Sequence, residues 1–134
     1  MKYKLKDLTI ENFKVKTLAK NYDTPIYCYS FEKIKNNINK FKKVFLKINP
    51  LICFSVKSNS NSNLLREINK LGLGADVVSM GELMKALKSG INPNKIVFSG
   101  VGKTSEEIIF AVKKKILLIN AESKSEILEI EKIA

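Results

Sequence analysis

Apolar positions along the chain follow a repeating pattern from about residue 51 onward. Short continuous apolar runs are each followed by a stretch in which apolar residues recur three and four positions apart. The first pattern is typical of buried strands and the second of amphipathic helices. Because the strands are apolar throughout, both faces of their sheet are expected to be covered, which indicates a parallel sheet. The pattern therefore predicts an α/β protein with four strand–helix units.

Helix start signals support these four units. The predicted strands are residues 52–56, 75–78, 95–98 and 116–119. The helices that follow them are expected to be capped by Asn61 or Ser62, then by Ser79, Thr104 and Ser123. The last three residues have a glutamate three positions further on, namely Glu82, Glu107 and Glu126, which is the spacing of a capping box. We interpret these carboxylates as helix caps rather than as catalytic acids or bases, and Gly72 and Gly90 as helix ends.

The unit length of about twenty residues suits either a β/α barrel or a doubly wound sheet. A complete barrel needs eight such units, typically about 250 residues. The fold prediction is a partial (β/α)8 TIM-type barrel that comprises about its first four units.

Residues before this repeat are less regular. We predict a strand at residues 8–10, a helix at 16–22 and a strand at 26–29. Ser30 is expected to cap a longer helix with Glu32 near its positive end, ending before residues 49–50. The apolar positions of this helix are Ile34, Ile38, Phe41, Phe45 and Ile48.

The amino-acid composition excludes several kinds of catalytic and metal site. The chain contains no histidine, which excludes histidine-based triads and histidine metal sites from these 134 residues. Its two cysteines, Cys28 and Cys53, lie in apolar runs, so we expect two buried free thiols in a reducing compartment and no metal site.

The net charge of +11 arises from 24 basic and 13 acidic residues. Such charge can indicate a nucleic-acid or anionic-membrane partner. However, Arg66 is the single arginine and the lysines are scattered, whereas base recognition and bidentate phosphate binding favour clustered arginine. No apolar run reaches the roughly 18 residues of a membrane span, and the N-terminus lacks the apolar centre of a signal peptide. We expect a cytoplasmic protein without nucleic-acid or membrane partners.

Two charged residues, Lys57 and Asp76, are candidates for a functional site. Lys57 follows an apolar run and precedes small polar residues, at the carboxyl end of the first predicted strand of the repeat. It is either a reactive amine or an ordinary solvated charge. Asp76 lies within an apolar strand, where a carboxylate usually has a partner. From spacing alone, a structural and a functional role for Asp76 remain equally open.

Residues 99–104 (SGVGKT) lie between a strand and a helix and end as a phosphate-binding P-loop does. That motif needs a first glycine five positions before the second, and Val97 occupies this position. The G-x-G-x-x-G pattern also fails, because Ser105 stands at its last glycine. We interpret the segment as a turn before a capped helix.

Five segments, in order, resemble the fold-type III pyridoxal-phosphate decarboxylases. They are residues 24–29 (TPIYCY), 53–59 (CFSVKSN), 74–83 (GADVVSMGEL), 96–104 (IVFSGVGKT) and 119–123 (INAES). The fourth segment is most similar to the diaminopimelate decarboxylase branch, rather than to the ornithine, arginine or carboxynorspermidine branches.

The resemblance implies a pyridoxal 5'-phosphate cofactor, with Lys57 as the residue that forms a Schiff base with its aldehyde and Asp76 close to it. It implies an amino-acid substrate, meso-2,6-diaminopimelate, which loses CO2 to give lysine. It also implies that residues 1–30 begin a β domain and that residues 31–134 are the N-terminal half of the cofactor-binding barrel.

Other parts of the family's site match no position here. These are the histidine stacked on the cofactor ring, the glycine-rich phosphate site, the acid at the pyridine nitrogen, and the partner subunit's cysteine and tyrosine. We therefore expect an N-terminal portion from a split, degraded or truncated gene that is inactive alone. Association with a separately encoded C-terminal half, or a homodimer, remains an alternative.

Overall fold

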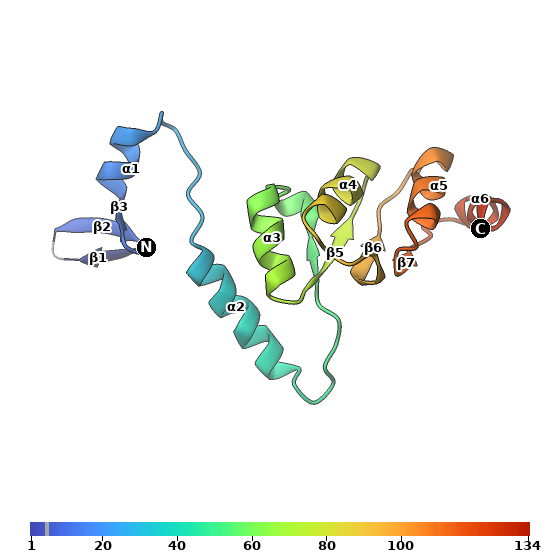
Figure 1. Ribbon diagram of the computed structural model, residues 1–134, viewed down its shortest axis with the longest axis horizontal. Helices are drawn as coiled ribbons and strands as arrows, with labels where there is room; N and C mark the ends of the chain where they lie inside the picture. The colour runs from blue at the N-terminus through green and yellow to red at the C-terminus, as the bar shows by residue number, and fades with distance from the viewer. Residues whose placement is uncertain (5) are drawn as a thin grey trace. The chain divides into compact units, whose positions relative to one another are not determined.

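The computed structural model describes residues 1–4 and 6–134, which form two compact units, 1–49 and 50–134. Each unit contains one sheet, as the ribbon in Figure 1 shows. The sheet of the first unit is antiparallel and three-stranded, and that of the second is parallel and four-stranded. Among the described residues, no helix is both long and apolar enough to cross a bilayer.

The first unit begins with a sheet of strand order β1-β2-β3, followed by two helices. Its elements are β1 (Lys2–Lys4), β2 (Asp7–Ile10), β3 (Phe13–Lys14), α1 (Val15–Asn21) and α2 (Phe31–Val44). The predicted strand at residues 8–10 is confirmed as part of β2, and the predicted helix at 16–22 is confirmed as α1.

The start of α2 is fixed by two side chains. The Ser30 hydroxyl accepts a hydrogen bond from the Lys33 N–H at 3.1 Å, as predicted for its cap. A Glu11 carboxylate oxygen in turn accepts from the Glu32 N–H at 2.8 Å and from the Ser30 hydroxyl at 2.9 Å. These bonds hold the pKa of Glu11 below its ordinary value. The helix ends at Val44, one turn earlier than predicted, because residues 45–48 form turns that lead into Asn49 at φ 46°.

Two predictions for residues 26–29 are wrong. The segment is irregular rather than a strand, and Tyr27 is 93% exposed. Cys28 is a free but exposed thiol, not a buried one. A strand needs a neighbour to satisfy its backbone N–H and C=O groups, and the described ladders of this unit join only β1, β2 and β3.

The second unit consists of four strand–helix units in a parallel sheet of order β4-β5-β6-β7, as predicted. Its strands are β4 (Cys53–Ser55), β5 (Gly74–Val77), β6 (Ile96–Phe98) and β7 (Leu118–Ile119). Its helices are α3 (Ser62–Lys70), α4 (Met80–Lys88), α5 (Ser105–Lys113) and α6 (Lys124–Ile133). Two 3-10 turns, η1 (Val56–Ser58) and η2 (Pro93–Lys95), lie beside β4 and β6. Gly72 and Gly90 end α3 and α4 with φ values of 77° and 86°, as predicted.

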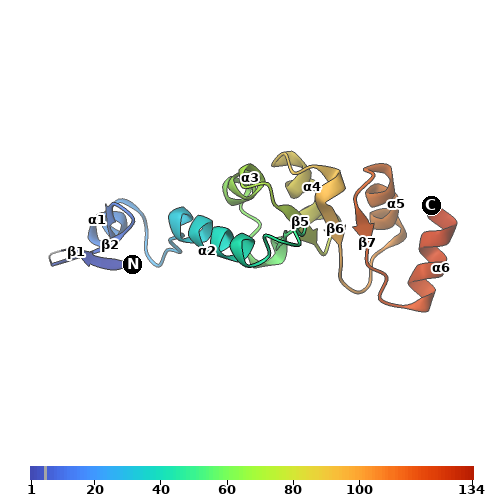
Figure 2. The same cartoon turned by 90° about the horizontal axis from the view of Figure 1, so that it is seen from below.

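One face of this sheet forms the core. Alternate residues Ala75, Val77, Ile96 and Phe98 are fully buried on that face. The helix residues buried with them are Leu65, Leu83, Ala86 and Ala111. Figures 1 and 2 show α3 and α4 along this face.

The opposite face differs from the prediction that both faces are covered. By strand alternation and register, it carries Cys53, Ser55, Asp76 and Val97, which are half-buried, and Leu118, which is 49% exposed. The polar strand residues Ser55 and Asp76 therefore lie on this second face, together with Val97 and Leu118, whereas the first face is apolar throughout.

Candidate functional site

Lys57 lies in η1, the single 3-10 turn that follows β4, rather than on the strand itself. Val56 before it is fully buried in the core, whereas Lys57 is exposed. The Ser58 hydroxyl donates to the Ser55 carbonyl at 2.7 Å, and the Asn59 N–H donates to the Val56 carbonyl at 3.0 Å. The backbone of the turn is thus fixed from both sides while the amine of Lys57 remains accessible.

The loop after Lys57 is also well fixed. Asn59 accepts a hydrogen bond from the Asn61 N–H at 2.9 Å. The Asn61 carboxamide caps α3 by accepting from the Asn63 and Leu64 N–H groups. Lys85 of α4 donates to the Ser60 hydroxyl at 2.9 Å. This loop, described as the Lys57 loop (residues 56–61), therefore holds its lysine at a defined place.

A polar row crosses the carboxyl ends of all four parallel strands, and we define it as Ser55, Asp76, Ser99 and Asn120. The Ser99 hydroxyl donates to one Asp76 carboxylate oxygen at 2.6 Å, and the Ser55 hydroxyl donates to the other at 3.4 Å. The Asn120 side-chain amide donates to the Ser99 hydroxyl at 3.0 Å. Each member comes from or follows a different strand, because the register aligns the strand ends.

Ser55 connects the two residues that the sequence singled out. Its hydroxyl binds Asp76, and its carbonyl accepts from Ser58 in the turn that carries Lys57. The partners of Asp76 are hydroxyl groups, which keep its carboxylate oriented on the sparsely covered face. Burial, followed by the nearby Asp76 charge, raises the pKa of the Cys53 thiol on the same face. The site thus combines an accessible amine, a carboxylate with fixed orientation and hydrogen-bonding side chains.

The three glutamates predicted as helix caps are confirmed in that role. The full capping box forms between Thr104 and Glu107. Glu82 accepts from the Val78 N–H at 2.9 Å, and Glu126 accepts from the Glu122 N–H at 2.7 Å. Glu107 also accepts from the Met80 N–H of α4 at 2.8 Å, and this bond is the main reason why its pKa lies below the ordinary value.

The segment at residues 99–104 is a turn before a capped helix, as interpreted, and its lysine is buried. The Lys103 side chain is 1% exposed and forms an ion pair with Glu126 at 2.8 Å. Sequence reasoning missed this burial, and it missed Ser55, Ser99 and Asn120. The available signal for the last three was that each is the first polar residue at the end of an apolar strand.

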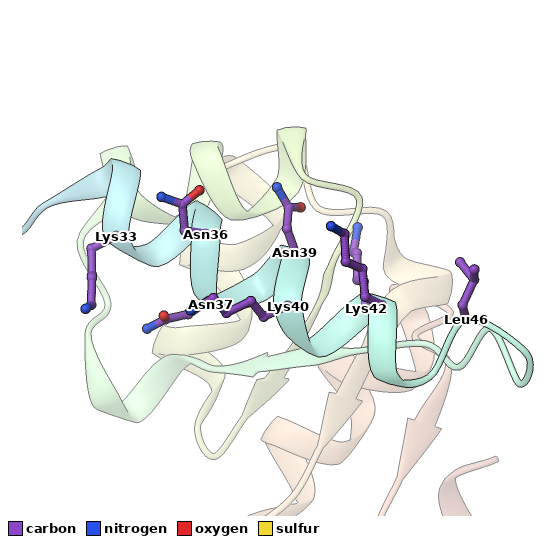
Figure 3. A pocket seen from close by; sticks show the side chains of 8 residues that line it. Lys33, Asn36, Asn37, Asn39, Lys40, Lys42 and Leu46 are labelled. Atoms are coloured by element: carbon purple, nitrogen blue, oxygen red, sulfur yellow. The ribbon is translucent and has the colours of Figure 1, made fainter.

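A separate hollow of about 610 Å³ lies along α2 in the first unit (Figure 3). Its lining is basic and amide in character: Lys33, Asn36, Asn37, Asn39, Lys40, Lys42, Lys43 and Leu46. Almost all of these side chains are exposed, and they come from one helix and the residues just after it. The lining thus consists mainly of solvated polar side chains from a single helix, four of them lysines.

Within the described residues, no group of three or more histidine, cysteine or acidic side chains is arranged to hold a metal ion. The side chains at the strand ends are instead suited to an organic group. An amine can attack a carbonyl carbon of such a group, and hydroxyl and amide side chains can bind its polar substituents. Lys57, Asp76, Ser99 and Asn120 therefore fit a carbonyl-bearing cofactor.

Comparison with known proteins identifies the family. The sequence model for "Pyridoxal-dependent decarboxylase, pyridoxal binding domain" matches residues 31–134. The diaminopimelate decarboxylase of Helicobacter pylori strain J99 is 48% identical over 122 residues, and that of Aquifex aeolicus is 42% identical over 134 residues. These alignments cover 91% and 100% of this chain but 30% and 31% of the two relatives.

A solved structure gives the same result. The diaminopimelate decarboxylase of Helicobacter pylori complexed with L-lysine superposes with a TM-score of 0.84 at 46% identity. The match covers 88% of this chain and 30% of that structure. The chain thus spans about 30% of the length of the relatives that it matches.

Proposed function

Because the chain belongs to the pyridoxal-dependent decarboxylase family through its pyridoxal-binding domain, we propose that it supplies the lysine-bearing part of a diaminopimelate decarboxylase. The proposed overall reaction removes CO2 from meso-2,6-diaminopimelate and leaves L-lysine, the last step of lysine biosynthesis. The observation that carries the proposal is the exposed Lys57, held on a fixed turn beside the polar row at the carboxyl ends of parallel strands.

In this proposal, Lys57 holds the cofactor through its side-chain amine. Val56 anchors the turn in the core, so that the amine is presented outward from a rigid backbone. When bound, pyridoxal 5'-phosphate supplies an electron sink for the electron pair that remains on the substrate carbon as CO2 leaves.

Asp76 orients the cofactor in this proposal. Ser99 and Ser55 each donate to one of its two carboxylate oxygens, so the direction of the carboxylate is fixed before any ligand arrives. Preorganised charge of this kind is effective because it needs no rearrangement during the reaction. Asn120 extends the arrangement by holding the Ser99 hydroxyl.

We further propose that residues 1–30 begin a β domain and that residues 31–134 form about the first four units of a TIM-type barrel. This arrangement is supported by the parallel order β4-β5-β6-β7, in which each strand is followed by a helix. A cytoplasmic location belongs to the same proposal.

These residues are proposed to lack decarboxylase activity when assayed alone. The family's ring-stacking histidine has no counterpart, because the chain contains no histidine. Release of CO2 from diaminopimelate by purified chain and pyridoxal phosphate would contradict this proposal.

An alternative is that the chain acts only by association with a separately encoded C-terminal half. The observation that favours association is the apolar character of β7 and its surroundings, where Leu117 and Leu118 are 50% and 49% exposed. Co-expression with the C-terminal part of a relative would test this, and recovery of diaminopimelate decarboxylation in the mixture is the expected result. Preferential decarboxylation of ornithine or arginine by that mixture would instead identify a different branch of the family.

The direct test of the proposed role of Lys57 is site mapping of cofactor attachment. The folded chain is incubated with limiting pyridoxal 5'-phosphate, reduced with borohydride, digested and analysed by mass spectrometry. We expect Lys57 to carry more label than any other exposed lysine, and the Lys57→Arg variant to lose this excess. Equal labelling of all exposed lysines would contradict the proposal, and the buried Lys103 is the internal control for a folded chain.

A further inference from the structure

Lys103 has all three of its ammonium protons engaged by acceptors of the protein. Its Nζ donates to the Gly100 carbonyl at 2.7 Å, to the Asn120 carbonyl at 2.7 Å and to a Glu126 carboxylate oxygen at 2.8 Å. It also lies 5.7 Å from the centre of the Phe98 ring, within the range of a cation–π interaction. An ammonium has three donors and no acceptor, so this set of partners satisfies it completely.

This geometry is incompatible with a phosphate-binding role for the lysine. No donor of Lys103 is left for a ligand, and its side chain is 1% exposed. The adjacent hollow of about 340 Å³ is lined in part by Glu122, Glu126 and Glu129, whose charges repel an anion. The lysine therefore acts within the protein rather than on a ligand.

The three partners of Lys103 belong to different parts of the sheet edge. Gly100 lies in the loop after β6, Asn120 follows β7 directly, and Glu126 lies in the first turn of α6. One ammonium thus joins the ends of two neighbouring strands to the helix that follows them. Without it, these three acceptors lose their shared donor, because carbonyls and a carboxylate cannot bind one another.

Asn120 connects the hydrogen bonds of Lys103 to the polar row. Its backbone carbonyl accepts from Lys103, and its backbone N–H donates to the Phe98 carbonyl at 2.9 Å. With both backbone groups fixed, its side chain donates to the Ser99 hydroxyl, which in turn donates to Asp76. A continuous chain of hydrogen bonds runs from Lys103 through Asn120 and Ser99 to the Asp76 carboxylate.

We propose that Lys103 is a positioning residue, whose buried ammonium sets the orientation of Asp76 through Asn120 and Ser99. The inference rests on the proposed function only for the role of Asp76 in the site. The hydrogen bonds from Lys103 to Asp76 are present in the protein without any ligand, so their effect can be measured in the free chain.

The experiment uses NMR on the full chain, labelled with 13C and 15N, without cofactor. In the folded Lys103→Met variant we expect the Asn120 side-chain amide and the Asp76 carboxyl carbon to shift. Two controls separate positioning from general destabilisation. Lys132→Met removes an exposed ion pair with Glu129, and Leu65→Ala weakens the core in α3; neither is expected to move these two signals.

A second variant keeps the test decisive if Lys103→Met does not fold. Asn120→Ala removes an exposed side chain and leaves the backbone carbonyl that Lys103 binds. We expect the Asp76 carboxyl signal to shift while the Lys103 ammonium protons stay protected from exchange with water. An unchanged Asp76 signal in Asn120→Ala, or in folded Lys103→Met, would overturn the proposal. Failure of Lys57 to accept the cofactor would refute the proposed function and leave this result standing.

Discussion

Two loops of the parallel sheet each carry a lysine among small polar residues, yet the two lysines differ completely in their surroundings. In the Lys57 loop, the backbone is fixed by Ser58, Asn59 and Asn61 while the amine is exposed. In the loop after β6, the Lys103 amine itself is the fixing group and is 1% exposed. In the first loop, neighbouring residues order the backbone and the lysine amine makes no part of that order. In the second loop, the lysine amine itself provides the ordering hydrogen bonds. Only the first arrangement leaves the amine available for chemistry.

The physical reason is the cost of removing charge from water. A buried ammonium must exchange its hydration for hydrogen-bond acceptors and an opposite charge, as Lys103 does with two carbonyls and Glu126. An exposed amine keeps its water and needs no partner from the protein. The Lys103 amine therefore contributes to stability, whereas the Lys57 amine remains available for chemistry.

The largest expected effect is on stability. Lys103→Met should lower the free energy of unfolding by about 2–3 kcal/mol, because Glu126 loses its charged partner and keeps only the bond from the Glu122 N–H. The same substitution at exposed Lys57 should change it by less than about 0.5 kcal/mol. Urea unfolding of both variants, followed by circular dichroism, measures the difference. Equal losses in the two variants would contradict the comparison.

The helix caps of the two loops should be of similar strength. Asn61→Ala removes the cap of α3, and Thr104→Ala removes the cap of α5. Each should lower the free energy of unfolding by about 1 kcal/mol, because one or two N–H groups lose their acceptor. Similar values in the same unfolding assay would show that the loops differ in their lysines rather than in their caps. A loss in Asn61→Ala as large as that in Lys103→Met would remove this distinction.

The smallest expected effect is the change in stability at acid pH that arises from the Lys103–Glu126 ion pair. Burial alone raises the pKa of Glu126, but the Glu122 N–H and the Lys103 ammonium hold it below its ordinary value of 4.5. A lowered pKa in the folded state means that this contribution is fully present above pH 4.5 and is lost as pH falls through the folded value. The stability difference between wild type and Glu126→Gln should therefore be largest above pH 4.5 and shrink below it. Unfolding measured across this range tests the sign, and a difference that grows toward low pH would contradict it.

Local signals explain which parts of the structure were predictable from the sequence. The four strand–helix units and the caps at Ser79, Thr104 and Ser123 depend on periodicity and on contacts within one turn, so they could be predicted. The predicted strand at residues 26–29 was wrong because strand formation depends on a neighbour that the local pattern does not contain. The early end of α2 likewise depends on the turns that precede Asn49.

The candidate site was predictable only in its separate parts. Lys57 was singled out from its place at a strand end and Asp76 as a carboxylate within an apolar strand, and their catalytic roles stay predictions. Their connection through Ser55, and the extension to Ser99 and Asn120, depend on the register of four strands, which no single segment reveals. The burial of Lys103 depends in addition on Glu126, which lies 23 positions further along the chain.

The outward position of Lys57 on its anchored turn also has an evolutionary consequence. Selection for a folded chain is expected to act more strongly on Lys103 than on Lys57, because the Lys103 side chain is 1% exposed and ion-paired whereas Lys57 is exposed. A gene that drifts without selection for chemistry would therefore lose lysine at position 57 early and still encode the same fold. Under the proposed role of Lys57, lysine at position 57 across related sequences would report selection for reactivity, whereas lysine at position 103 would report selection for the fold.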